Sequence, residues 1–205
     1  MAGTDSRKKS AATALQEGGP VIILVEPQMG ENIGMAARAM LNCGLVDLRL
    51  VRPRDSWPNR HAVSASAGAT QVINQVRLYE TTNEAVADCG VVYASTARSR
   101  DMTNDIFTPR AAAADMSKQI SNNINVGVLF GKESKGLTND DIALANAIIH
   151  VPLNPSFTSL NIAQAVFAVA YEWFQTMSEA EPHTFVMPKE TRPANKQELG
   201  GLFEH

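Results

Sequence analysis

The side chains of this 205-residue chain that are best suited to chemistry lie in three short segments, residues 32–38, 131–136 and 152–161. The first segment carries Asn32 and, six residues later, Arg38. An amide both donates and accepts hydrogen bonds, and a guanidinium clamps a phosphate through parallel bonds. Taken alone, the pair also fits an ordinary helix start, in which Asn32 caps the helix and Arg38 is a surface cation.

The second segment places Lys132 and Glu133 between Gly131 and Gly136. Two glycines allow the backbone to bend sharply around a ligand, although a plain turn needs them equally. A phosphate-binding P-loop is excluded, because it requires Ser or Thr at position 133 and Gly at position 126. A dinucleotide loop is disfavoured, because the first predicted strand is followed by GxxxG rather than GxGxxG.

The third segment is rich in hydroxyls, amides and prolines, which restrict the shape of a loop. It ends in Ser159, Leu160 and Asn161. We expect Ser159 to cap the long helix that follows.

The composition predicts one globular domain, because 44% of the residues are hydrophobic and 19% are charged. The longest apolar runs are far shorter than the ~20 residues of a membrane crossing, so no membrane span is expected. Cys43 and Cys89 have no paired spacing, which favours a reducing cytoplasm and argues against a disulfide or zinc framework. A net charge of −3 argues against strong nonspecific nucleic-acid binding, so an RNA partner must meet a local patch.

Short apolar runs alternate with helical patterns, which predicts an α/β domain with a mostly parallel sheet flanked by helices. The expected strands are residues 21–26, 47–51, 91–96, 125–130 and 147–151. The expected helices are residues 33–42, 83–87, 109–121, 139–145 and 161–177. Thr108 before Pro109, and Thr138 before an acidic turn, are expected helix starts. All three candidate segments follow a predicted strand.

Residues 1–18 are interpreted as a flexible polar tail, residues 19–177 as the folded domain, and residues 178–205 as a linker with the start of a further helix. In that last segment Asn195 and Glu198 resemble a helix cap, followed by Leu199, Leu202 and Phe203. The apolar face ends before it can be buried. We interpret this segment as a truncated helical extension or a tail that docks on a partner subunit.

Taken in order, the three segments resemble the motifs of the SpoU/TrmH branch of the SPOUT RNA 2′-O-methyltransferases. The motifs are NIGxxAR at residues 32–38, LFGxExxGL at residues 129–137 and a proline loop ending in SLN at residues 152–161. The sequence of residues 95–100 and 154–166 is similar to that of the members that methylate nucleotide 32 of the tRNA anticodon loop. These members often carry Arg at the position of Lys132. The lysine replaces a planar guanidinium, which can form two parallel hydrogen bonds, with a compact ammonium charge.

The resemblance implies a five- or six-stranded α/β domain with a C-terminal deep trefoil knot, acting as a cytoplasmic homodimer on tRNA. The cofactor implied is S-adenosylmethionine. The resemblance places it against Thr96, Ala97, Gly131, Lys132, Glu133, Ile149, Val151, Ser159 and Leu160.

The resemblance also implies roles in catalysis. Arg38 is the key residue of the family and is often written as the base, yet a guanidinium rarely gives up its proton. We therefore expect Arg38 to clamp a phosphate and stabilise the developing alkoxide, while a phosphate oxygen or water takes the proton. Asn32 would orient Arg38 or the ribose, Glu133 would hold its loop or a cation, and Ser159 with Asn161 would fix the loop geometry. Glu133 and Asn161 fit a purely structural role equally well.

Local positive charge suggests where RNA binds. Arg60 lies in a cluster with Arg52, Arg54 and His61, and Arg98 and Arg100 follow the strand predicted at residues 91–96. Such groups often form only a solvated face, so a modest salt dependence of RNA binding is expected. Because the target is a ribose hydroxyl, the substrate is RNA and not DNA.

Two other functions stay open at this point. A ribosomal-RNA 2′-O-methyltransferase would carry the same motifs, and a noncatalytic RNA-binding protein would have the same fold. The sequence leaves the preferred base undecided. It shows no metal-ligand spacing, so methyl transfer is expected to be metal-independent.

Overall fold

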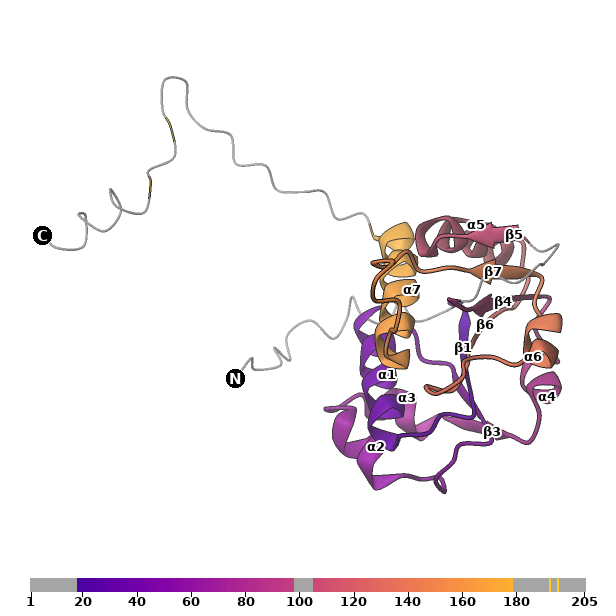
Figure 1. Cartoon of the computed structure of the whole chain (residues 1–205), viewed down its shortest axis with the longest axis vertical. Coiled ribbons are helices and arrows are strands. Elements are labelled where there is room, and N and C mark those ends of the chain that lie inside the picture. The colour runs from indigo at the N-terminus through magenta and orange to yellow at the C-terminus, as the bar shows by residue number, and fades with distance from the viewer. Residues whose placement is uncertain (1–17, 98–104, 179–191, 193–194, 196–205) are drawn as a thin grey trace, which may run out of the picture.

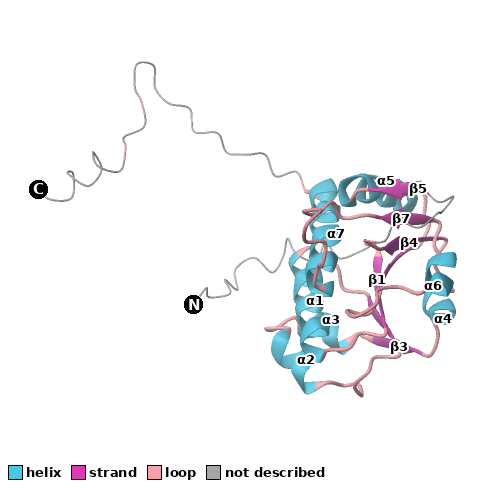
Figure 2. Cartoon of the chain, viewed as in Figure 1, coloured by secondary structure: helices cyan, strands magenta, loops and turns pink. Residues whose placement is uncertain are grey.

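The computed structural model describes residues 18–97 and 105–178, together with Arg192 and Asn195. In these residues a seven-stranded sheet forms the centre of the molecule (Figures 1 and 2). The strand order is β3-β2-β1-β6-β4-β7-β5, and every pairing between neighbours is parallel. The strands are β1 (Val21–Val25), β2 (Leu48–Val51), β3 (Arg77–Tyr79), β4 (Val91–Ser95), β5 (Asp105–Phe107), β6 (Val126–Phe130) and β7 (Ala147–Ile149).

Helices cover both faces of the sheet. On one side lie α1 (Gly30–Asn42), α2 (Arg60–Ala65), α3 (Thr70–Asn74), α5 (Pro109–Ser121) and α7 (Ile162–Met177). On the other side lie α4 (Thr82–Val86) and α6 (Asn139–Ala143), as Figure 1 shows. The strands β1 and β6 are buried along their whole length, as expected for a parallel sheet with two covered faces. The α/β architecture predicted from the sequence is confirmed.

The expected number of strands was too low. The two missing strands, β3 and β5, are three residues long and largely exposed at the two edges of the sheet, so they carry no apolar run. The short helices α2 and α3 were also missed. The five strands predicted from apolar runs are all present, each within two residues of its expected ends.

Two predicted helix starts need correction. Helix α1 begins at Gly30 with Met29 as its N-cap, so Asn32 lies inside the first turn and is not a cap. The N-cap of α7 is Asn161 and not Ser159, because the Asn161 side chain accepts a hydrogen bond from the Ala163 amide. The helix starts expected at Thr108 and Thr138 are confirmed, since both side chains cap the helices that follow.

None of the helices in the described part of the chain has the length and apolarity needed to cross a bilayer. Three expectations fall on residues outside the described ones: residues 1–17 of the polar tail expected at 1–18, the RNA-binding residues Arg98 and Arg100, and Glu198, the expected partner of Asn195 in a helix cap.

Candidate functional site: a cavity at the carboxyl ends of three central strands

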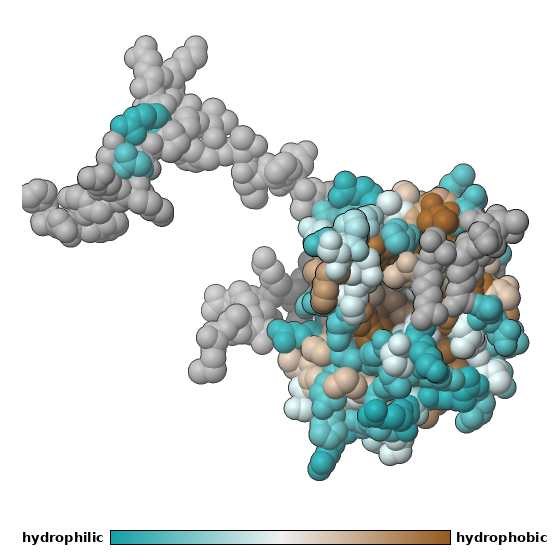
Figure 3. Space-filling model, viewed as in Figure 1, coloured by the Kyte–Doolittle hydropathy of each residue, from teal (hydrophilic) through white to brown (hydrophobic). Residues whose placement is uncertain are grey.

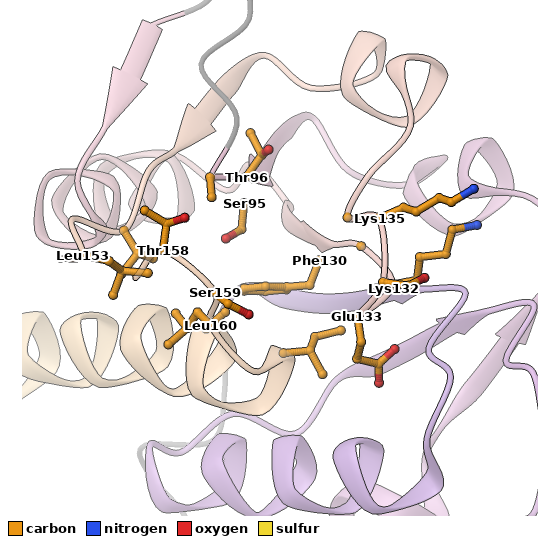
Figure 4. Close-up of a pocket in the computed structure, with 17 residues that line it drawn as sticks. Ser95, Thr96, Phe130, Lys132, Glu133, Lys135, Leu153, Thr158, Ser159 and Leu160 are labelled. Carbon is orange, nitrogen blue, oxygen red and sulfur yellow. The ribbon is translucent and has the colours of Figure 1, made fainter. Parts of the chain in front are cut away.

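A cavity of about 250 Å³ lies where the neighbouring strands β6, β4 and β7 end. Parallel α/β sheets commonly bind ligands at the carboxyl ends of their strands, because the loops there diverge. The walls come from residues 95–97 at the end of β4, the loop after β6, the loop between β7 and α7, and the first turn of α7 (Figure 4). In the space-filling view, apolar surface forms the floor of a recess on a largely hydrophilic face (Figure 3).

Eight of the nine residues expected to bind the cofactor line this cavity. They are Thr96, Ala97, Gly131, Lys132, Glu133, Val151, Ser159 and Leu160. The ninth, Ile149, is fully buried in the core, and its carbonyl oxygen accepts a hydrogen bond from the Thr96 amide at 3.1 Å. Ile149 therefore supports the cavity wall from behind without lining it.

The lining combines apolar side chains with hydroxyl groups and exposed backbone. Phe130, Leu153 and Leu160 offer apolar surface, while Thr158 and Ser159 supply hydroxyls. Among the residues that the structure describes, no group of three or more His, Cys, Asp or Glu side chains is placed to hold a metal ion. This mixed lining suits an organic ligand with both apolar and polar parts.

A chain of three side chains joins the three sequence motifs beside this cavity. The amide nitrogen of Asn161 donates to the side-chain oxygen of Asn32 at 2.9 Å, and the amide nitrogen of Asn32 donates to Glu133 Oε1 at 2.7 Å. Glu133 Oε2 accepts from the Gln28 backbone amide at 2.8 Å. We call Asn32, Glu133 and Asn161 the amide–carboxylate network. In Figure 4 the Glu133 side chain points from its loop toward the ribbon of α1.

The orientation of both amides in this network is set by their partners. Asn32 must turn its nitrogen toward Glu133, because a carboxylate only accepts hydrogen bonds. Its oxygen then faces Asn161, whose own oxygen already accepts from the Ala163 amide at 2.8 Å. Asn32 is buried, with 3% of its surface exposed, and both of its polar atoms are satisfied. Both ends of the Asn32 amide are therefore engaged in the network, and neither contacts Arg38. Glu133 likewise accepts from an amide side chain and a backbone N–H rather than from a cation.

The loop after β6 closes tightly on itself. A Cβ atom added to Gly131 would lie 2.1 Å from the backbone of both Gly136 and Leu137, so no other residue fits without moving the backbone. The Gly136 amide donates to the Lys132 carbonyl at 2.8 Å, and Gly136 adopts the left-handed φ of +69°. The glycines therefore make a turn and also shape a wall of the cavity.

Arg38 lies away from this cavity. It is exposed on the outer side of α1, and no side-chain hydrogen bond or ion pair joins it to another described residue. On the same outer side, Met35 is 41% exposed and borders a groove with Phe167 of the neighbouring helix α7. The structure thus gathers Asn32, Glu133, Ser159 and Asn161 around the cavity and leaves Arg38 facing outward.

The expected basic cluster is partly neutralised. Arg54 pairs with Asp55 at 3.2 Å, and His61 lies 3.2 Å from Glu31. The Arg60 Nε atom donates to the His61 ring at 3.4 Å. Of the RNA-binding residues predicted from sequence, Arg60 and Arg38 can be located, and both are exposed.

Two features of the site were missed in the sequence. Phe157, in the loop between β7 and α7, is 72% exposed although it is aromatic. Glu26, directly after β1, accepts a hydrogen bond from the Lys132 ammonium group, which belongs to the cavity loop. The local sequence does not indicate the contact between Glu26 and Lys132, because the two residues are 106 positions apart in the chain.

Comparison with known proteins identifies the family. Residues 19–171 match the model of the family described as the SpoU rRNA Methylase family. The chain belongs to the SpoU methylase family. All three motifs lie within the matched residues, so the amide–carboxylate network and the cavity are parts of a SpoU domain.

The similar proteins carry related names. The chain is 38% identical over 151 residues to the tRNA (cytidine/uridine/adenosine-2′-O-)-methyltransferase TrmJ of Pseudomonas aeruginosa (strain UCBPP-PA14). It is 39% identical over 151 residues to the tRNA (cytidine/uridine-2′-O-)-methyltransferase TrmJ of Photorhabdus laumondii. These matches cover 74% of the chain but only 58% and 62% of the relatives, so the chain spans about three fifths of their length.

A solved structure supports the fold of this SpoU domain. The crystal structure of TrmJ from Z. mobilis ZM4 aligns with a TM-score of 0.73 and 58% sequence identity. The alignment covers 76% of this chain and 68% of that one.

Proposed function

We propose that this chain carries the activity of an S-adenosylmethionine-dependent tRNA ribose 2′-O-methyltransferase that modifies nucleotide 32 of the anticodon loop in the cytoplasm. The observation that carries the proposal is the amide–carboxylate network, in which Asn32, Glu133 and Asn161 join the three motifs beside one cavity. The names of the relatives in P. aeruginosa and P. laumondii support a tRNA ribose as the target.

The residues around the cavity fit the proposed cofactor. S-adenosylmethionine has a flat adenine, a ribose and a charged amino-acid part. Phe130, Leu153 and Leu160 offer apolar surface for the adenine, and Thr158, Ser159 and the backbone of the Gly131 loop offer hydrogen bonds for the polar parts. When bound, the cofactor supplies an electrophilic methyl group on a cationic sulfur.

The residues of this chain have to prepare the nucleophile, since a ribose hydroxyl must lose its proton to attack. In the proposal Arg38 clamps the adjoining phosphate and stabilises the developing alkoxide, and a phosphate oxygen or water takes the proton. The amide–carboxylate network keeps the cavity loops in place. Phe157 presents an exposed ring on the loop that supplies Thr158 and Ser159 to the cavity, and an unstacked base of the anticodon loop can stack on it.

The proposed enzyme is a homodimer. The supporting observation is the exposed apolar surface along α1 and α7, where Met35, Phe167 and Tyr171 are each more than 40% exposed. Contiguous exposed apolar surface of this kind is typical of an interface between proteins. Because Arg38 lies on the same side of α1, a partner subunit seated there brings RNA and catalytic residues together at the interface.

The proposed fold includes a trefoil knot formed by the segment from β6 to α7. Two observations agree with it. The strand β7 is inserted between β4 and β5, which precede it in the chain, and the loops after β6 and β7 line the same cavity. Family membership supports the same conclusion.

The function is tested by incubating the protein with methyl-labelled S-adenosylmethionine and unmodified total tRNA. After alkaline hydrolysis, a 2′-O-methylated linkage resists cleavage and its position can be mapped. We expect one resistant linkage, at nucleotide 32.

Other results would contradict the proposal in distinct ways. Label that enters ribosomal RNA and not tRNA would favour the ribosomal alternative. Cofactor binding without transfer to either RNA would indicate that this chain lacks part of the catalytic unit. A protein that binds neither cofactor nor its demethylated product would favour a noncatalytic RNA-binding role.

A further inference from the structure

Three charged residues meet just beyond the carboxyl ends of β1, β2 and β6. Glu26 follows β1, Arg52 follows β2, and Lys132 lies in the loop after β6. Glu26 Oε2 accepts a hydrogen bond from the Lys132 ammonium group, and Glu26 Oε1 accepts one from Arg52 Nη2 at 2.8 Å. We call Glu26, Arg52 and Lys132 the edge cluster. Arg52 also donates to the Glu80 carbonyl beyond β3 at 2.8 Å, so the cluster ties together four adjacent strand ends.

The backbone of this cluster is held in an unfavourable conformation. Glu26 and Arg52 have φ angles of +50° and +42°, in the left-handed region that residues with a side chain rarely adopt. Their amides nonetheless bond to neighbouring strand ends, Glu26 to the Val51 carbonyl at 2.8 Å and Arg52 to the Tyr79 carbonyl at 3.1 Å. Strained residues persist where the surrounding contacts hold them, and such residues concentrate at functional sites.

The cluster acts on the cavity through Lys132. This residue lies between Gly131, whose backbone is packed too closely for a Cβ, and Glu133, which belongs to the amide–carboxylate network. Only 24% of the Lys132 side chain is exposed. The hydrogen bond from Lys132, followed by the one from Arg52, lowers the pKa of Glu26, so its carboxylate stays charged near neutral pH.

The negative charge of Glu26 also affects the electrostatics of the cavity wall. Lys132 and Lys135 both line the cavity, and in Figure 4 both ammonium groups point to the same side. Without Glu26, Lys132 would lose its carboxylate partner, and the wall would carry two lysines against the single carboxylate of Glu133. A ligand with an extra positive charge would then be repelled, and a neutral analogue of the same shape would be repelled less.

We propose that Glu26 is a positioning residue for the cofactor cavity: it holds Lys132 and offsets its positive charge, so that the cavity accepts a cationic sulfonium ligand. This inference rests on the proposed function for the identity of the ligand. It predicts that the charge of Glu26 favours S-adenosylmethionine over S-adenosylhomocysteine, because the demethylated product has lost the positive charge on sulfur.

The test is calorimetric binding of both ligands to the wild-type chain and to Glu26→Gln, which keeps the size of the side chain and removes its charge. We expect S-adenosylmethionine to bind about three- to tenfold more weakly to the variant, and S-adenosylhomocysteine to lose less than about twofold. In a Lys132→Met background, the added Glu26→Gln change should have less than about a twofold effect, because the partner of Glu26 on the cavity wall is gone and only Arg52, outside the cavity, remains.

Glu80→Gln is the matched control. It removes one carboxylate just beyond β3, where the backbone carbonyl and not the side chain contacts the cluster. Its two dissociation constants should stay at the wild-type values. The melting temperature of each variant separates a binding effect from partial unfolding.

Several outcomes would overturn the proposal. It is overturned if Glu26→Gln binds both ligands as tightly as the wild type, or if it loses affinity for both ligands equally. It is also overturned if Glu26→Gln causes the same loss of affinity in the Lys132→Met background as in the wild type. If the wild-type chain binds neither ligand, the proposed function fails and this inference fails with it. Wild-type binding of both ligands with no change in Glu26→Gln defeats only the role of Glu26.

Discussion

At the scale of single residues, Asn32 is the point at which the three motifs meet. Replacing it with Asp keeps its shape but places a carboxylate where the amide nitrogen now faces Glu133 at 2.7 Å. Two adjacent ionised carboxylates repel each other, which destabilises the folded state. We expect Asn32→Asp to lower the free energy of unfolding by about 1–3 kcal/mol at pH 8.

The loss in Asn32→Asp should shrink at pH 5, because a protonated Asp can again donate a hydrogen bond to Glu133. Urea denaturation at both pH values measures this. Asn42→Asp is the control, since Asn42 is exposed near the end of the same helix. It should change stability by less than about 0.5 kcal/mol at either pH. A deficit in Asn32→Asp that does not depend on pH would contradict the orientation of the network.

Substitutions of Arg38 test its proposed role in methyl transfer. Because it is exposed and lies outside the cavity, Arg38→Lys and Arg38→Ala should bind S-adenosylmethionine as the wild type does. Methyl transfer to tRNA should fall by about a hundredfold or more in the Ala variant, which loses the electrostatic stabilisation. The Lys variant keeps the charge but not the planar fork, so near-normal turnover would rule out a need for the fork. Calorimetry and single-turnover kinetics separate the two effects.

At the scale of elements, the loop after β6 depends on two glycines for different reasons. In Gly131→Ala the new Cβ would lie 2.1 Å from backbone atoms, so the loop has to open and affinity for S-adenosylmethionine should fall about tenfold or more. In Gly136→Ala nothing lies within 4 Å of the new Cβ, but the φ of +69° is strained. That change should cost about 1 kcal/mol of stability with little loss of affinity. Calorimetry and melting curves of both variants test this; equal affinities would show that loop closure does not shape the cavity.

At the scale of the whole molecule, an ion pair between a buried arginine and a half-exposed aspartate links β2 to the segment after α4. Arg49 is only 2% exposed and donates to both carboxylate oxygens of Asp88, and to the Ala85 carbonyl at 2.6 Å. The hydrogen bond from Arg49 lowers the pKa of Asp88 below its ordinary value of 3.8. A carboxyl whose pKa is lowered by folding stabilises the folded state above its unfolded pKa, and this stabilisation is lost as the pH falls through the folded pKa.

We therefore expect Asp88→Asn to be about 2 kcal/mol less stable than the wild type at pH 7, because the substitution leaves a buried guanidinium without its full partner. Below pH 3.8 the difference should narrow, because the carboxyl of the unfolded wild type takes up a proton there, whereas the folded one is protonated only at a lower pH. Asp55→Asn, in an exposed pair with Arg54, should cost less than about 0.5 kcal/mol. Urea denaturation from pH 7 to pH 3 decides this. A constant difference between wild type and Asp88→Asn across this range would contradict the role of the ion pair.

The amino-acid sequence by itself determined the parts of this protein that depend on local patterns. The apolar runs of β1 and β6 and the spacing of apolar residues in α7 are readable because burial on two faces or on one stripe imposes a local signal. Thr108 and Thr138 are readable as caps because a cap bonds within three residues. The motifs also identified most of the residues that line the cavity.

Only the tertiary structure decided which of these residues touch. Asn32 meets Glu133 and Asn161 across 101 and 129 positions, because the strand order places β6 beside β1. The same order brings Lys132 to Glu26, and neither residue has a local pattern that predicts it. The edge strands β3 and β5 escaped prediction because short, exposed strands are stabilised by their neighbours and not by burial of their own. Local patterns report whether a side chain is buried, whereas contacts between distant segments depend on how the whole sheet is ordered.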